Sequence, residues 1–228
     1  MTARTWIAIA TLHVACVRNL PDSDGHDARE MMASTVKVEI RVKQSSGFTG
    51  MDGSGFVVAT DGHRKLSLVM TAAHVALVND QVAVGYAATV VVKTLDDRSC
   101  TAAQWVVDVE HDIVILLVDC VAGNPVTFAT TLPPQGATVS FSGAPMGLHP
   151  RGVFWVTEGR YLGIYNDGDV AFSVPSHDGG SGSGIFYRGR VIGMFHRRDS
   201  IFEEATFGVS LEWLRQAMDT ANSTWNSK

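Results

Sequence analysis

Short apolar segments separated by turn residues recur along this chain, and long helical periodicity is absent. Every second residue from Val36 to Val42 is aliphatic and the residues between are charged, which is typical of a half-buried β-strand. Further strands are expected at 53–58, 66–70, 82–84, 88–93, 101–108 and 113–119, and then at 137–142, 151–164, 169–174, 184–188, 190–196 and 206–209. These two series, of about six strands each, predict an all-β fold of two six-stranded antiparallel barrels.

One helix is expected near the C-terminus. Ser210 is a suitable N-cap, and Leu211, Leu214 and Met218 follow it at helical spacing. A polar tail is expected to begin at Asn222. The predicted division is a leader and linker at 1–25, a first barrel at 26–122, and a second barrel with the helix at 123–228.

The composition suits one large domain or two small ones. With 228 residues, 46% of them hydrophobic and 18% charged, the chain can bury about 70% of its unfolded surface. The formal net charge is -5, and the Lys and Arg residues are scattered rather than clustered. Nucleic-acid binding is therefore not expected.

The N-terminus has the layout of a secretory signal, with Arg4 before an apolar run from Trp6 to Val17. The run is too short to span a bilayer. Leu12–Cys16 also resembles a bacterial lipoprotein signal, although His13 stands where that signal has an aliphatic residue. We expect an exported protein, periplasmic or secreted, whose only membrane contact would be a lipid anchor at Cys16. The alternative is an ordinary apolar strand or helix.

The chain has three cysteines, Cys16, Cys100 and Cys120. A hairpin centred near residue 110 would set Cys100 opposite Cys120, so a cross-strand disulfide is plausible and would agree with an oxidising compartment. Two free buried thiols are the alternative.

The glycine-dense stretch from His177 to Phe186 runs directly into an apolar strand. Glycines on both sides let the backbone project Ser181 while neighbouring N–H groups point at the same place. This arrangement indicates a nucleophile with its oxyanion hole. A flexible Gly/Ser loop is the alternative, and Ser183 is a second candidate nucleophile.

A serine nucleophile needs a base, and the base needs a group that orients it. His74 follows an apolar strand, and Asp112 stands at the mouth of another. Asp108 is the rival acid. His111 lies beside Asp112 but should face the other way and be solvated.

Three segments carry a family resemblance, namely Thr71–His74, Asp112–Leu116 and Gly179–Gly184. They resemble, in order, the signature segments of trypsin-like serine proteases, and the HtrA-like bacterial branch is nearest. The likeness extends over about residues 35–220 through further segments at 53–57, 143–147, 156–159 and 191–193. It implies a chymotrypsin-like double barrel with the site in the cleft between the barrels.

The resemblance also implies the chemistry. Ser181 would be the nucleophile, His74 the general base and then acid, and Asp112 its orienting group. The backbone N–H groups of Gly179 and Ser181 would form the oxyanion hole. The implied function is a serine endopeptidase that cleaves proteins or peptides without metal or cofactor.

Some residues depart from the family pattern. Gly180 replaces the Asp that pairs with a new N-terminus in digestive trypsins, so activation by that route is not expected. Pro175 stands where trypsin has its acidic specificity residue, so a preference for Arg or Lys is not supported. The pocket wall should come from Phe195, His196 and Arg197. Phe195 would favour small or apolar side chains, whereas a one-residue shift would let His196 bind an acidic one.

Other classes fit less well. An α/β-hydrolase needs Gly-x-Ser-x-Gly with the acid and His after the serine, and here Ser183 replaces the second glycine and the order is reversed. The glycines are not followed by the Lys of a P-loop, and no zinc-ligand spacing is present. HtrA proteins usually carry a PDZ domain, for which this chain is too short. The runner-up function is a catalytically inactive module that binds extended peptides by β-augmentation.

Overall fold

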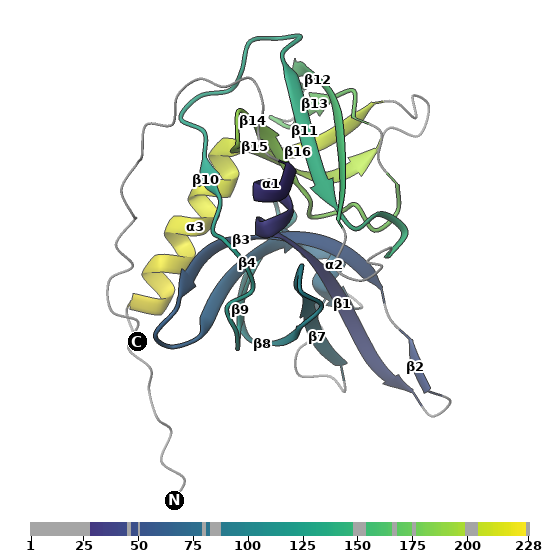
Figure 1. The fold of residues 1–228 in the computed structure, drawn as a ribbon, viewed down its shortest axis with the longest axis vertical. Coiled ribbons are helices and arrows are strands. Elements are labelled where there is room, and N and C mark those ends of the chain that lie inside the picture. Colours follow the sequence, from purple (N-terminus) through teal and green to yellow (C-terminus); the bar gives the residue numbers. More distant parts are fainter. Residues whose placement is uncertain are drawn as a thin grey trace, which may run out of the picture.

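The computed structural model describes residues 28–44, 47–49, 51–78, 81–82, 88–147, 154–165, 168–174, 177–198 and 205–226. The expected leader, including Cys16, lies outside them. Within the described residues, no helix is long and apolar enough to cross a membrane. Two β-barrels lie one above the other in Figure 1, and helix α3 (Leu211–Asn226) runs along one side of both.

The first barrel is a closed antiparallel sheet. Its strands, in spatial order, are β1 (Thr35–Gln44), β3 (Asp52–Asp61), β4 (Leu66–Ala72), β9 (Ile113–Val118), β8 (Ser99–Asp108) and β7 (Ala88–Lys93). Pairing of β7 with β1 closes the barrel. Strand β2 (Gly47–Thr49) pairs antiparallel with the end of β1, and β5 (Leu77–Val78) pairs with β6 (Gln81–Val82) as a separate ribbon.

The second barrel repeats this plan. Its strands, in spatial order, are β15 (Arg190–Arg198), β14 (Gly184–Tyr187), β11 (Thr138–Gly143), β12 (Trp155–Ile164), β13 (Val170–Phe172) and β16 (Thr206–Ser210). Pairing of β15 with β16 closes it. Strand β10 (Thr127–Phe128) adds to β15 in parallel, and the short 3-10 turn η1 (Pro145–Gly147) follows β11. The prediction of two six-stranded antiparallel barrels is confirmed.

Alternating side chains fill each barrel. In β1 the aliphatic residues Val36, Val38 and Ile40 are buried, because successive residues of a strand face opposite sides. The core of the first barrel continues through Phe186, Met194 and other residues of the second barrel into α3. The two barrels therefore share one apolar interface and form one unit.

Helix α3 joins the barrels. It contacts β8 and β9 of the first barrel and β15 and β16 of the second. Leu214, Ala217, Ala221 and Trp225 form its buried stripe at helical spacing. The expectation of a polar tail from Asn222 is therefore wrong, because burial of Trp225 keeps the last turn helical.

Two further contacts tie the chain together. Helix α1 (Ala28–Ser34) contacts β1, β11 and β12 and lies between the barrels in Figure 1. Cys100 and Cys120 form a disulfide with their Cα atoms 5.7 Å apart. Because β8 and β9 are paired, this bond closes the open end of their hairpin, and the predicted pairing is confirmed.

Candidate active site

His74 and Asp112 meet because of the register between two buried strands. Ala72, the last residue of β4, pairs with Ile113, the first residue of β9. His74 lies in the short helix α2 (Ala73–Ala76) directly after β4, and Asp112 lies directly before β9. The two side chains therefore project from the same end of the first barrel.

Asp112 holds His74 in a defined orientation. Its Oδ1 accepts the backbone N–H of His74 at 2.8 Å, and its Oδ2 lies 2.7 Å from His74 Nδ1. Its own φ of 56° is left-handed, a conformation that Asp adopts more readily than most residues. A proton on Nδ1 leaves Nε2 as the acceptor, which is the tautomer that a general base requires. The His74 side chain is 45% exposed, so a substrate can reach it.

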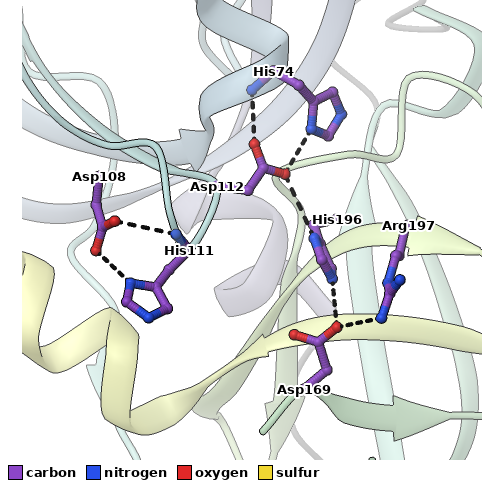
Figure 2. Close-up of polar contacts among 7 residues, drawn as sticks. All are labelled: His74, Asp108, His111, Asp112, Asp169, His196 and Arg197. Atoms are coloured by element: carbon purple, nitrogen blue, oxygen red, sulfur yellow. Dashed lines mark hydrogen bonds and ion pairs between the residues drawn. The ribbon is translucent and has the colours of Figure 1, made fainter. Parts of the chain in front are cut away.

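A second histidine lies on the other side of Asp112. His196 Nδ1 is 3.6 Å from Asp112 Oδ2, and its Nε2 is 3.1 Å from Asp169 Oδ2. Arg197 Nη2 donates to the same Asp169 oxygen at 2.8 Å. Figure 2 shows the resulting line of side chains from His74 through Asp112 and His196 to Asp169. His196 is on β15 and Asp169 directly precedes β13, so this line crosses from the first barrel to the second.

Charges along this line stabilise one another. Burial opposes ionisation of Asp112, but the nearby His196 and the hydrogen bonds from His74 hold the pKa of its carboxyl well below the ordinary value. Burial also disfavours a charged His196, but its two carboxylate neighbours outweigh this and raise the pKa of the imidazole. Burial of Asp169 is likewise outweighed by His196 and Arg197, which lower the pKa of its carboxyl.

Backbone hydrogen bonds connect the Ser181 segment to β3 and β15, next to the end of β4. The Ser181 carbonyl accepts the N–H of Ser54 at 2.8 Å, and the N–H of Gly182 donates to Phe195 at 2.7 Å. A Cβ on Gly182 would lie 2.3 Å from Thr71 Oγ1, so Ser181 lies close to the end of the strand that precedes His74. In the described part of the chain, Ser181 Oγ makes no hydrogen bond with His74.

The turn before Ser181 leaves two donors available. The N–H of Gly180 donates to His177 at 2.9 Å, and Gly179 has a φ of 84°, which is the geometry of a type II turn. Met146 N–H donates to the Asp178 carbonyl. In a trans peptide the N–H points opposite to the carbonyl, so the Gly179 N–H points away from Met146. Across the described residues, the N–H groups of Gly179 and Ser181 donate no hydrogen bond.

Ser54 braces this turn from the first barrel. Its buried Oγ donates to the Gly179 carbonyl and accepts the N–H of Ala144, both at 2.8 Å. Sequence reasoning treated residues 53–57 only as a strand and missed this role. The available signal was a small polar residue between two glycines, Gly53 and Gly55, in an otherwise apolar strand.

Within the described ranges, the alternative candidates for the nucleophile and the acid, Ser183 and Asp108, form no hydrogen bond with His74. Ser183 is fully buried, and its Oγ has no hydrogen-bond partner among the described residues. Asp108 Oδ2 lies 2.8 Å from His111 Nδ1, and the pair is separate from His74 in Figure 2. The expectation of a solvated His111 is wrong, because its ring stacks on Trp213 at 3.8 Å between centroids and its side chain is only 19% exposed.

The three pocket-wall candidates separate in the structure. Phe195 is buried, packs edge-on against Phe141 and lies beside Gly180 of the turn. His196 and Arg197 both contact Asp169. Pro175 lies outside the described residues. Within those residues, no group of three or more His, Cys, Asp or Glu side chains could hold a metal ion.

Known structures share this fold. The serine endoprotease from Yersinia pestis superposes with a TM-score of 0.67 at 18% sequence identity, over 85% of this chain and 64% of that one. The Rv3671c protease from M. tuberculosis in its active form gives a TM-score of 0.67 at 22% identity, over 84% of this chain and 82% of that one. An inactive mutant form of Rv3671c gives 0.63 at 22% identity, over 86% and 90%. This chain thus spans less than two thirds of the Yersinia chain.

Sequence comparison gives the family. No curated protein sequence matches the chain. The family model of the trypsin-like peptidase domain matches residues 53–194, a stretch that contains His74, Asp112 and Ser181. The chain belongs to the trypsin-like peptidase family.

Proposed function

We propose that this protein is a serine endopeptidase that works through His74, Asp112 and Ser181. The observation that carries the proposal is the 2.7 Å contact between Asp112 Oδ2 and Nδ1 of an accessible His74. This contact orients the imidazole so that Nε2 can accept a proton. Membership of a peptidase family and the position of Ser181 beside β4 support the same conclusion.

The reaction would proceed in two halves. Ser181 Oγ bonds to the peptide carbonyl carbon while its proton passes to His74 Nε2. The C–N bond then breaks, and His74 returns the proton to the departing amine. Water attacks the acyl-enzyme in the same way, and the proton that it loses to His74 ends on Ser181 Oγ. Asp112 stays ionised throughout and stabilises the imidazolium.

The oxyanion of each tetrahedral intermediate would bind the N–H groups of Gly179 and Ser181. Such donors stabilise the transition state by about 3 kcal/mol each. The type II turn and the brace from Ser54 support this role, because they fix the Gly179 peptide before a substrate arrives.

The substrate would be an extended protein or peptide segment. Phe195 beside the turn supports a preference for small or apolar side chains at the cleavage position. The Cys100–Cys120 disulfide supports export, since such bonds persist in oxidising compartments. Lipid attachment at Cys16 belongs to the same proposal.

Labelling with a fluorophosphonate probe tests the nucleophile. We expect the probe on Ser181 by peptide mapping, together with hydrolysis of casein. Ser181→Ala should abolish both, because the probe and the substrate react with the same oxygen. No label on folded protein would contradict the proposal and would favour the inactive peptide-binding module.

Ser183→Ala is the matched control. It removes a serine hydroxyl two residues from Ser181. That oxygen is buried and has no hydrogen-bond partner among the described residues. Loss of an unpaired buried hydroxyl should leave stability and labelling close to those of the unmodified protein. Labelling that disappears in Ser183→Ala and persists in Ser181→Ala would identify Ser183 as the nucleophile.

A further inference from the structure

We propose that His196 is a positioning residue of this site, which carries a positive charge while it holds Asp112 in place between the two barrels. The inference rests on the proposed serine endopeptidase function. It assigns a role to a side chain that the sequence suggested for the pocket wall.

The contacts of both ring nitrogens carry the argument. Nδ1 is 3.6 Å from Asp112 Oδ2, and Nε2 is 3.1 Å from Asp169 Oδ2. A neutral imidazole has one N–H and one lone pair, so one nitrogen would turn its lone pair toward a carboxylate. Only the doubly protonated ring turns an N–H toward both carboxylates, in a hydrogen bond with Asp169 and a longer ion-pair contact with Asp112. Two carboxylates placed on opposite nitrogens therefore select the imidazolium.

The surrounding charges are consistent with this state. The titratable or charged groups that the described residues place around His196 are Asp112, Asp169, Arg197 and, beyond Asp112, His74. The side chains of His196 and Asp169 are each only 16% exposed, so water screens their interaction weakly. When His196 is charged, the negative charges of Asp112 and Asp169 are balanced by the positive charges of His196 and Arg197. With it neutral, Asp112 and Asp169 would leave an excess negative charge beside His74.

A cation at this place affects the general base. Asp112 Oδ2 is shared between His74 and His196, so a positive charge on His196 offsets part of the negative charge that Asp112 presents to His74. Asp112 then stabilises the imidazolium form of His74 less strongly, and His74 returns the serine proton more readily. His196 also restrains Asp112 from the second barrel, whereas the other contacts of that carboxylate come from the first.

Substitution of His196 by glutamine tests the charge. Glutamine keeps a hydrogen-bond donor but carries no charge, so His196→Gln should move the acidic limb of kcat/KM upward by about 0.5–1 pH unit. A purely structural role would lower activity without moving the limb. His111→Gln is the matched control, since His111 also pairs with an aspartate but outside the site. It should leave the limb unchanged. An unmoved limb in His196→Gln would overturn the proposal.

A second measurement does not depend on activity. Nitrogen NMR of the histidines in Ser181→Ala should show both His196 nitrogens protonated at neutral pH, with a titration midpoint above the ordinary value of about 6.5. Asp169→Asn should lower that midpoint. A His196 ring with a single N–H at neutral pH would overturn the proposal even if Ser181 proves to be the nucleophile. Conversely, failure to label Ser181 would reject the endopeptidase function, while the NMR result would still report the charge on His196.

Discussion

Gly179 is the residue at which local geometry and proposed catalysis depend most directly on each other. Its φ of 84° is left-handed, and an added Cβ would lie 2.9 Å from Ala144 O and from the backbone nitrogens of Met146 and Gly147. Gly179→Ala should therefore displace the turn and its N–H group. We expect kcat for a peptide ester to fall about 10²–10³-fold, with a smaller change in KM.

Gly136→Ala separates backbone strain from loss of the donor. Gly136 has a φ of 83°, but an added Cβ would meet nothing within 4 Å. This variant should lose about 1 kcal/mol of stability and keep full activity. Equal losses of activity in both variants would show that the turn at Gly179 has no special role.

Sequence alone indicated His74, Asp112 and Ser181, because each lies in a short local motif next to a strand. It did not reveal the contacts of His196 with Asp112 and Asp169. That side chain depends on the irregular pairing between Phe195 and Arg197 on β15, and on a partner, Asp169, from another strand connection. Long-range placements of this kind leave no local pattern to detect. The stacking of His111 on Trp213 was missed for the same reason.

At the scale of elements, the disulfide between Cys100 and Cys120 closes the β8–β9 hairpin over a sequence separation of 20 residues. Replacement of both cysteines by alanine should lower the free energy of unfolding by about 3 kcal/mol, since the unfolded chain gains freedom. For a chain of this size, the midpoint of thermal unfolding should fall by about 6–12 °C. Calorimetry measures both quantities.

Reductant provides the control for that variant. It should destabilise the unmodified protein toward the level of the double variant and leave the double variant unchanged. A double variant that still responds to reductant would point to a different effect. Equal stability with and without the cysteines would show that the bond does not stabilise the folded protein.

Most strands were predictable because period-two burial follows from the pleat itself, as in β1. The end of α3 was not. Asn222 and Ser223 look like the start of a tail, yet they lie on the exposed side of a helix whose other side buries Ala221 and Trp225. The prediction of two barrels depended on many strands with period-two patterns, so the misplaced end of the C-terminal helix did not affect it.

For the whole molecule, the charges at the barrel interface predict how stability depends on pH. The pKa values of Asp112 and Asp169 are lowered on folding, so their contribution is present above about pH 4 and is lost as the pH falls further. The pKa of His196 is raised, so its contribution is complete below about pH 6.5 and is lost as the pH rises through its folded value. Stability should therefore be greatest between these limits.

Denaturant unfolding at a series of pH values measures this profile. His196→Gln should remove the decline above about pH 6.5, because the variant has no imidazole at this position to deprotonate. The decline in acid should become smaller but persist, because His74 and Arg197 still pair with Asp112 and Asp169. A decline above pH 6.5 that persists unchanged in His196→Gln would assign it to another group.

The order of the site residues along the chain has a consequence for synthesis on the ribosome. His74 and Asp112 leave the ribosome first, whereas Ser181, the turn braced by Ser54, and the helix that spans both barrels come much later. Under the proposed function, a partly made chain would therefore contain the base and the acid but no nucleophile. It would not cut neighbouring nascent proteins until the second barrel had been made.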